Sequence, residues 1–189
     1  VGPMRAAARF VSRWLDEGCL LDRVAHVRCE LFGSLALTGR GHGTDKAVLC
    51  GLEGATPDTI DPDSIPATLK RIRSEGKIRL LGKHEIAFDE KNDLIFNKRQ
   101  KLPYHPNGMR YSAFDADGNE LATRDYYSVG GGFVVNADEA ADDRIVADTT
   151  PLPHPFHSGD ELLAICESTG KTIAQVMLDN EKSWRSEAE

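Results

Sequence analysis

Two strand-like runs, 109–115 and 120–127, flank the pair Asp117-Gly118. An Asp-Gly pair between such runs favours the positive φ angles of a tight hairpin turn. The run 24–32 alternates cleanly between apolar and polar residues, which predicts a half-buried strand. The chain must therefore fold around a sheet that is mainly antiparallel.

Segments with helical periodicity precede, separate and follow these strands. Prolines and short polar residues stand at their starts and glycines at their ends, as helix boundaries favour. The predicted helices are 3–17 closed by Gly18, 46–52 capped by Thr44 and closed by Gly54, and one from Ile65 that Asp63 or Ser64 caps and Gly76 closes.

Further strands are predicted near 85–88 and 94–97, with Asn92-Asp93 in the turn between them. The order of elements indicates an α+β fold, with helices packed against the mainly antiparallel sheet. A stiff proline-rich connector starts at Pro151, and two more helical patterns follow it. We therefore expect one domain over 1–150, and over 151–189 a linker with the first helices of a neighbouring domain.

Composition excludes several classes of function. The net charge of −7 over 189 residues argues against nucleic acid as a partner. No stretch approaches the roughly 20 apolar residues that span a membrane, and no signal pattern precedes the first helix. Both ends of the chain look like cuts.

The four cysteines have no clustered spacing, which predicts buried free thiols in a reducing compartment such as the cytoplasm. They are Cys19, Cys29, Cys50 and Cys166. His154 and His157 are three residues apart, but Pro155 between them breaks the helical geometry that a metal pair needs.

The run 33–45 follows the first predicted strand and carries the most chemistry. It contains four glycines together with Arg40, His42 and Asp45. Histidine titrates near neutral pH and can move a proton, Arg40 could attract a carboxylate, and Thr44 or Asp45 could orient the imidazole. The alternative is a tight glycine turn with His42 as an exposed loop residue.

Two other segments have features of a site. In 103–109, two prolines stiffen a loop that carries His105 and Asn107, although this could be a proline-shaped turn alone. In 126–132, three glycines interrupt a strand pattern, which predicts a bulge or close backbone approach. We expect Tyr126 and Tyr127 to be core residues.

Together, the stretches 33–45, 105–109 and 126–135 resemble the β domain of iron–sulfur-dependent L-serine dehydratase, or L-serine deaminase. The opening tetrapeptide Val1-Gly2-Pro3-Met4 strengthens the resemblance, because in that family it follows a serine-rich segment ending in His-Thr. Several later residues also resemble the family's exit toward its catalytic domain; these are Pro155-Phe156, Ser158, Glu161-Leu162-Leu163 and Asn180-Glu181. The resemblance covers essentially the whole chain.

The resemblance implies conversion of L-serine to pyruvate and ammonia by a lyase with a [4Fe-4S] cluster and without pyridoxal phosphate. The cluster would be held by an iron–sulfur α domain absent from this sequence, because none of the four cysteines matches a cluster ligand. This chain alone is therefore not expected to turn over serine. The family also implies a homodimer.

The resemblance also implies roles for individual residues. His42 would be the base or the group that orients the substrate. Further residues would position substrate or shape the pocket; these are Ser34, Thr38, Arg40, Asp45, His105 and Asn107.

A non-catalytic interpretation remains open. The family's β domain resembles the allosteric substrate-binding domain of some D-3-phosphoglycerate dehydrogenases. The same glycine-rich run could then bind a small anion or serine for regulation, or the chain could serve only in dimerisation.

Overall fold

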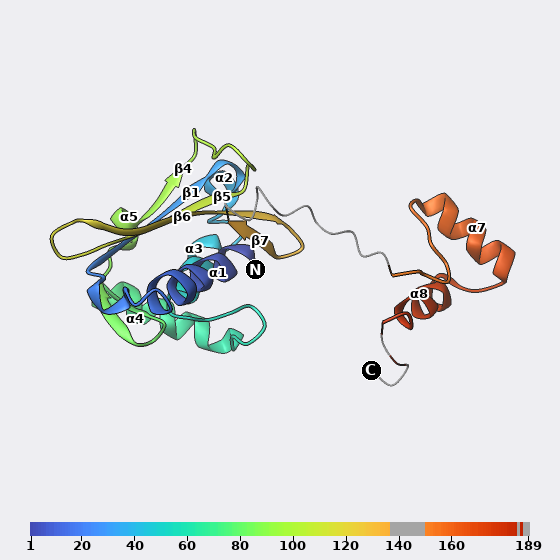
Figure 1. The fold of residues 1–189 in the computed structure, drawn as a ribbon, viewed down its shortest axis with the longest axis horizontal. Helices are drawn as coiled ribbons and strands as arrows, with labels where there is room; N and C mark the ends of the chain where they lie inside the picture. The colour runs from blue at the N-terminus through green and yellow to red at the C-terminus, as the bar shows by residue number, and fades with distance from the viewer. Residues whose placement is uncertain (137–149, 185, 187–189) are drawn as a thin grey trace. The chain divides into compact units, whose positions relative to one another are not determined.

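The computed structural model describes residues 1–136, 150–184 and 186 (Figure 1). The chain divides into two compact units, Val1–Arg144 and Ile145–Glu189. Each is described by itself below, and the domain boundary near residue 150 stays a prediction.

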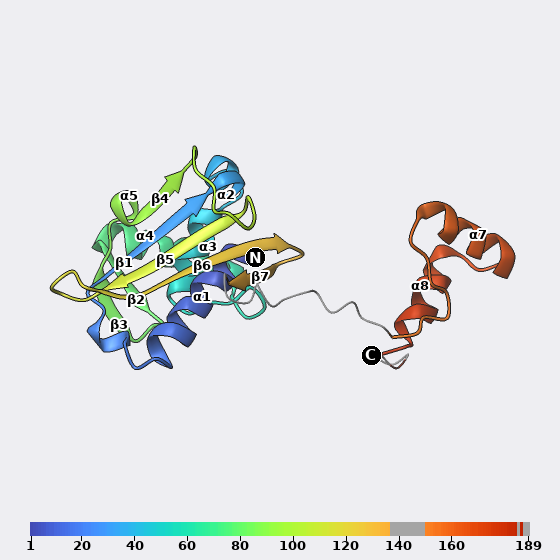
Figure 2. The same cartoon turned by 45° about the horizontal axis from the view of Figure 1, so that its top comes forward.

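A five-stranded sheet forms the centre of the first unit, with the strand order β4-β1-β5-β6-β7 (Figure 2). β1 pairs with β4 in parallel, and the other neighbouring strands pair in antiparallel fashion. The α+β fold and the mainly antiparallel sheet are thus confirmed. The strands are β1 (His26–Phe32), β4 (Leu94–Asn97), β5 (Gly108–Phe114), β6 (Glu120–Gly130) and β7 (Phe133–Asn136).

The predicted hairpin forms from β5 and β6, and Gly118 in its turn has a φ of 82°. The three glycines 130–132 all have positive φ and make a second hairpin turn, between β6 and β7. The sheet is therefore not interrupted there. The expected bulge is present as a register shift between Ser128 and Gly130.

Strands form near 85–88 and 94–97 as predicted, but they do not pair with each other across a turn. β3 (His84–Ala87) pairs instead with β2 (Lys77–Leu80), a strand that was not predicted. The expected turn is a short helix, α5 (Glu90–Asp93). The Asp93 carboxylate accepts hydrogen bonds from the Asp89 backbone N–H and from His26 Nε2, both at 2.7 Å, which directs β4 to the edge of the main sheet beside β1.

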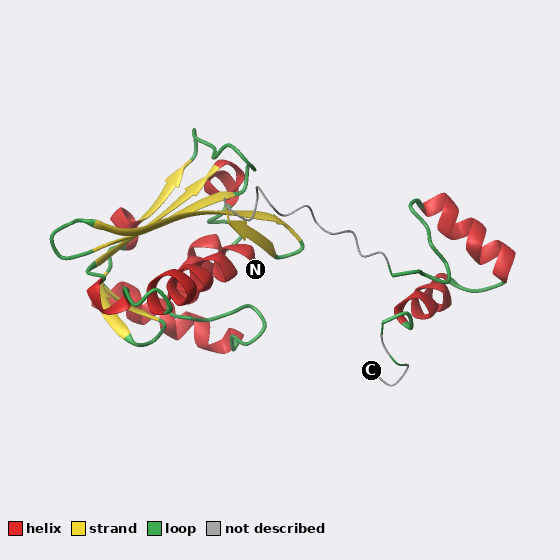
Figure 3. Ribbon diagram, viewed as in Figure 1, coloured by secondary structure: helices red, strands yellow, loops and turns green. Residues whose placement is uncertain are grey.

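Helices cover one face of the sheet (Figures 1 and 3). The first helical run contains α1 (Gly2–Arg9) and a wider π-helical stretch, η1 (Phe10–Asp16). It crosses α3 (Thr44–Leu52), which packs on α4 (Ile65–Glu75). Two short 3-10 segments, η2 (Leu21–Arg23) and η3 (Pro62–Ser64), lie in the connections.

Three predicted helix boundaries need correction. Cys19, with a φ of 55°, takes the left-handed conformation after the first helix, rather than Gly18. Gly43 holds the N-cap position of α3, so Thr44 is the first helical residue. Ser64 precedes α4 without a side-chain cap, but Gly76 ends α4 as predicted, with a φ of 62°.

The core lies between the sheet and these helices. Tyr111 and Tyr126 are almost fully buried there, and Phe10 stacks on Tyr111 with ring centroids 5.7 Å apart. Tyr127 is buried in a smaller cluster with Phe32 on the opposite face of the sheet. The prediction of core tyrosines is confirmed.

The four cysteines are free thiols, but only two are buried. Burial raises the pKa of the Cys29 and Cys50 thiols. Cys19 is exposed because it lies in the turn after the first helix, and Cys166 is half-buried. The prediction of free thiols is thus confirmed, but the prediction that they are all buried is wrong for Cys19 and Cys166.

The second unit contains α7 (Gly159–Thr169) and α8 (Ile173–Glu181), which confirms both helical patterns. Asn180 fixes the connector to α8, because its side chain bonds both the N–H and the carbonyl of His154. His154 Nε2 lies 3.3 Å from an Asp179 oxygen. No helix among the described residues is long and apolar enough to cross a membrane.

Candidate functional site

The glycine-rich run after β1 is more ordered than a loop. Residues Gly33–Thr38 form a short helix, α2, and residues 39–43 make the turns that lead into α3. Gly33 has a φ of 54°, and a Cβ placed on it would lie 2.2 Å from the carbonyl oxygen of Pro106. Only glycine fits this junction, because the clash is with backbone.

The structure brings the three sequence motifs together at one end of the sheet. The Ser34 N–H donates to the Pro106 carbonyl at 3.0 Å. The Asn107 side-chain amide donates to the Ser128 carbonyl at 3.2 Å, and the Ser128 N–H donates to the Asn107 carbonyl at 3.0 Å. The 33–45, 103–109 and 126–132 segments are therefore joined in a continuous hydrogen-bonded row.

The start of the chain packs against the same row. A Cβ on Gly2 would lie 2.3 Å from Ser128 Oγ. Arg5 Nη1 donates to the Gly132 carbonyl at 2.8 Å, and Gly132 itself lies close to the Val1 side chain. The first residues are thereby fixed beside the candidate site.

His105 has a defined hydrogen-bond role in this row. Its Nδ1 lies 3.1 Å from the backbone nitrogen of Asn107, whose N–H can only donate. Nδ1 must therefore accept, so the neutral ring carries its proton on Nε2. His105 is half-buried and can present an N–H donor to a ligand.

Ser34 and Thr38 both lie on α2 and are exposed. Thr38 Oγ1 donates to the Ser34 carbonyl at 2.9 Å, so its hydroxyl oxygen still has lone pairs for a ligand. The Ser34 hydroxyl has no hydrogen bond within the described part of the chain.

His42 is exposed in the turn between α2 and α3. Its backbone N–H donates to the carbonyls of Thr38 and Gly39 at 3.3 and 3.2 Å. In residues 1–136, 150–184 and 186, neither Thr44 nor Asp45 bonds its imidazole, contrary to the expectation that one of them orients the ring. Thr44 is buried, and Asp45 instead faces Arg73 at 3.5 Å.

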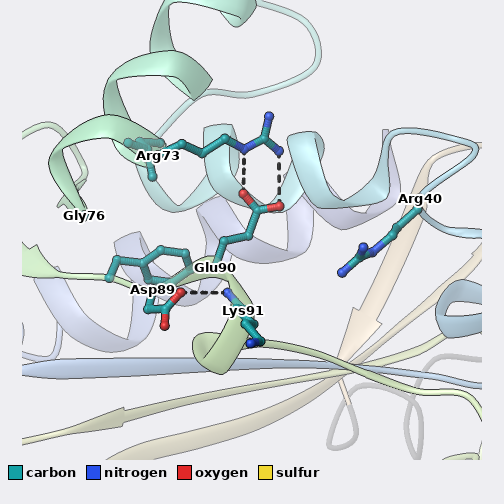
Figure 4. Close-up of a pocket in the computed structure, with 8 residues that line it drawn as sticks. Arg40, Arg73, Gly76, Asp89, Glu90 and Lys91 are labelled. Atoms are coloured by element: carbon teal, nitrogen blue, oxygen red, sulfur yellow. Dashed lines mark hydrogen bonds and ion pairs between the residues drawn. The ribbon is translucent and has the colours of Figure 1, made fainter.

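Arg40 does not lie over the same site as His42. Its guanidinium lies over the Phe96 ring, 5.0 Å from the centroid. It lines a cavity of about 500 Å³ that also includes Arg73 and Glu90, and His42 is not among the lining residues (Figure 4). The expectation that Arg40 attracts a carboxylate stays a prediction, and the turn places its guanidinium beside Phe96.

Comparison with known proteins places the chain in a family. The model described as serine dehydratase beta chain matches residues 1–139. The chain belongs to this family. L-serine dehydratase of Streptomyces coelicolor is 54% identical over 189 residues, L-serine dehydratase 1 of Escherichia coli 39% over 190, and L-serine dehydratase of Mycobacterium tuberculosis 41% over 189.

These alignments cover all of the chain but only 41%, 41% and 40% of the three relatives. The chain thus spans about two fifths of the length of the curated relatives it matches. Its likeness to them extends through α7 and α8, since each alignment includes the whole sequence.

The residues described here do not fit an iron–sulfur cluster. Such clusters are held by several cysteine thiolates, whereas Cys29 and Cys50 are buried in the core and Cys19 is at the surface. No group of three or more histidine, cysteine or acidic side chains in the described ranges could hold a metal ion.

Several contributors to the site carry no signal in the sequence. Pro106 and Gln100 take part through backbone carbonyls that accept from Ser34 and Gly33. Ser128 likewise takes part through its main chain. Only the neighbouring glycines and prolines, which permit close backbone approach, could have indicated these contacts.

Proposed function

We propose that this chain forms one side of the active site of an L-serine dehydratase, which converts L-serine to pyruvate and ammonia. The observation that carries the proposal is the hydrogen-bonded row that joins Ser34, Pro106, Asn107 and Ser128. Family membership and the names of the relatives, which are L-serine dehydratases, support serine as the substrate.

In this reaction the hydroxyl leaves as water, the α-proton is removed, and the resulting aminoacrylate hydrolyses to pyruvate and ammonia. We assign to His42 either the removal of the α-proton or the orientation of the substrate. An imidazole that has no partner in the described ranges can receive a proton. Its turn follows α2, which carries Ser34 and Thr38.

The remaining candidates would bind rather than react. The Nε2–H of His105 is suited to donate to the serine carboxylate, and the Ser34 and Thr38 hydroxyls can accept from its ammonium group. Asn107 would hold His105 in place, because its backbone N–H fixes the ring and its side chain is bound to β6. Arg40 and Asp45 would shape the neighbouring surface instead of contacting serine.

Further parts of the enzyme would complete the site. We propose that a [4Fe-4S] cluster on an α domain outside this sequence takes part, and that pyridoxal phosphate does not. We also propose that residues 1–150 are the β domain and 151–189 the start of the connection to the α domain. A homodimer and a cytoplasmic location are part of the same proposal, the second supported by four free cysteines.

A chimeric protein tests the role of His42. The chain replaces the matching segment of the Streptomyces coelicolor L-serine dehydratase, to which it is 54% identical. Removing a general acid or base typically costs about 10²–10⁴-fold, so His42→Ala should lower kcat/KM by at least about a hundredfold. Lys46→Ala, an exposed change in α3, is the control and should leave the rate unchanged.

His42→Asn separates the two roles, because asparagine can orient serine but cannot take its proton. An Asn variant as slow as the Ala variant supports proton transfer, and a near-normal Asn variant supports orientation. A near-normal rate for His42→Ala would contradict both. Saturable serine binding by the 189-residue chain alone, measured by calorimetry, would favour a regulatory site instead.

A further inference from the structure

The large hydrophobic side chains that the first unit exposes gather at the candidate site. Within residues 1–136 they are Val1, Leu37, Tyr104 and Phe133. Leu37 lies on α2, and Tyr104 directly precedes His105. Phe133 follows the glycine turn 130–132, against which Val1 packs. Each of the four therefore belongs to a segment that forms or borders the hydrogen-bonded row.

Two of these side chains extend the smaller apolar cluster on the sheet face opposite α1 and α3 (Figure 3). The Tyr104 ring contacts the buried Tyr127 ring, with centroids 5.1 Å apart. Val135 pairs with Tyr127 across the strands, and Phe133 precedes Val135 by two residues, so strand alternation places both on one face. We call this set the apolar patch; its members are Tyr104, Tyr127, Val129, Phe133 and Val135.

The apolar patch has accessible surface and a polar border. Tyr104 is 50% exposed and Phe133 is 69% exposed. Arg110 borders the patch, because its guanidinium lies 5.9 Å from the centroid of the Phe32 ring in the same cluster. Asp125 binds this guanidinium through both carboxylate oxygens, at 2.6 and 2.8 Å. Exposed aromatic groups beside a satisfied ion pair are typical of a protein–protein interface.

The part of the relatives outside the matched segment is the partner that fits the apolar patch. The chain covers only 41%, 41% and 40% of the three relatives, so most of each relative lies outside the match. A second copy of this chain would bring the same residues again, and those in the described ranges do not fit the cluster of the proposed site. The site therefore needs a different polypeptide surface beside His105, which the patch adjoins through Tyr104.

We propose that the apolar patch is the docking surface for the serine dehydratase domain that completes the active site, and that this domain meets it with an apolar surface of its own. Docking buries Tyr104 and Phe133, and it removes water from the neighbourhood of His105, which strengthens the hydrogen bond that His105 can donate to a carboxylate. This docking rests on the proposed function, but it is measured without any turnover of serine.

Cysteine labelling compares the apolar patch in the 189-residue chain and in the chimeric enzyme, each with Cys19 and Cys166 replaced by serine. Phe133→Cys reacts with a maleimide, and mass spectrometry of the peptide that contains it gives the rate. We expect labelling at least about tenfold slower in the chimera, because a docked domain excludes the reagent. Ala116→Cys, exposed in the β5–β6 turn, is the control and should be labelled equally fast in both proteins.

A charge placed within the apolar patch tests the chemistry of the contact. In the chimera with Phe133→Cys, Tyr104→Asp should raise the labelling rate at least about fivefold, since burying an unpaired carboxylate opposes docking. Lys70→Asp, at an exposed position on α4, is the control and should leave the rate unchanged. Circular dichroism checks the fold of each variant, and Tyr104→Cys replaces Phe133→Cys in the comparison of the two proteins if Phe133→Cys does not fold.

Equal labelling of Phe133→Cys in the two proteins would overturn the proposal. Slow labelling in the 189-residue chain alone would also overturn it: relief by dilution would mean that a second copy covers the patch, and no effect of dilution would assign the cover to the chain's own second unit. A chimera that protects Phe133→Cys but does not convert serine would support the docking and count against the proposed function, so the two proposals fail separately.

Discussion

Replacing Gly33 with alanine tests whether the junction between α2 and the 103–109 segment is built on close backbone approach. At a φ of 54°, any Cβ costs about 1–2 kcal/mol. The alanine Cβ would also lie 2.2 Å from the Pro106 carbonyl oxygen. This overpacking should lower the free energy of unfolding by about 1–3 kcal/mol. Relieving the clash moves Pro106 away and breaks the hydrogen bond that it accepts from Ser34, which should lower the free energy of unfolding by about 0.5–1.5 kcal/mol more.

Gly82→Ala is the matched control. Gly82 has a φ of 68°, but a Cβ there would meet nothing within 4 Å, so it carries only the backbone cost. We expect Gly33→Ala to be less stable than Gly82→Ala by about 2 kcal/mol. Urea unfolding followed by Trp14 fluorescence measures the difference, with Trp184 in the second unit replaced by phenylalanine in all proteins.

The activity of the same variants provides a second test of the junction at Gly33. In the chimeric enzyme, Gly33→Ala should lower kcat/KM because α2 and His105 no longer keep their spacing, whereas Gly82→Ala should not. If the two variants lose equal stability, within about 0.5 kcal/mol, the close approach at Pro106 contributes nothing and the reasoning is refuted.

Three other predictions follow from single contacts. Gly51→Ala should destabilise by about 2 kcal/mol in urea unfolding despite alanine's better helix propensity, because its Cβ would lie 2.3 Å from a carbonyl oxygen of α1; a gain in stability would contradict this. Nitrogen NMR should find neutral His105 protonated on Nε2, since Nδ1 accepts from Asn107, and a proton on Nδ1 would be inconsistent with that bond. The hydrogen bond from Lys171 lowers the pKa of the Asp179 carboxyl. This contact should therefore stabilise α8 fully at pH values above the ordinary carboxyl pKa, and the stabilisation should be lost as the pH falls through the lowered pKa. Carbon NMR of Lys171→Met should show a higher Asp179 pKa, and an unchanged pKa would refute the pairing.

The elements that could be predicted from the sequence are those whose boundaries depend on local chemistry. The β5–β6 turn at Asp117-Gly118 needs positive φ, and Gly76 and Gly170 end α4 and α7 in the left-handed conformation. In each case a residue within the turn itself determines the backbone. Neighbouring residues therefore carry enough information for the prediction.

Pairing between distant strands was less predictable. The run 94–97 has the same local pattern whether it pairs with β3 or with β1. Its parallel place beside β1 depends on Asp93, whose carboxylate binds His26, 67 residues away in the sequence. The Asn92-Asp93 pair indicated a turn, but the bond between the Asp93 side chain and the distant His26 favours pairing of β4 with β1.

The candidate site likewise has features that could be predicted from the sequence and features that could not. Side chains that carry chemistry, such as His42 and His105, can be recognised by type and by the glycines and prolines around them. The directions of these side chains cannot be recognised in the same way. His42 is only two positions after Arg40 in a tight turn, yet Arg40 lines a cavity that His42 does not line. A composition rich in functional groups therefore predicts that a site is near, but not which groups act together.

The contacts that hold the site together are mostly main-chain contacts. The Pro106 and Asn107 carbonyls accept from the backbone N–H groups of Ser34 and Ser128, and these bonds join segments that are about 70 and 20 residues apart in sequence. Any residue except proline has the same N–H and every residue has the same carbonyl, so such contacts leave no side-chain pattern. Gly33 is the exception, because a carbonyl approaching within 2.2 Å of its Cβ position excludes every other residue. A glycine at such a position is therefore the one mark that a main-chain junction leaves in the sequence.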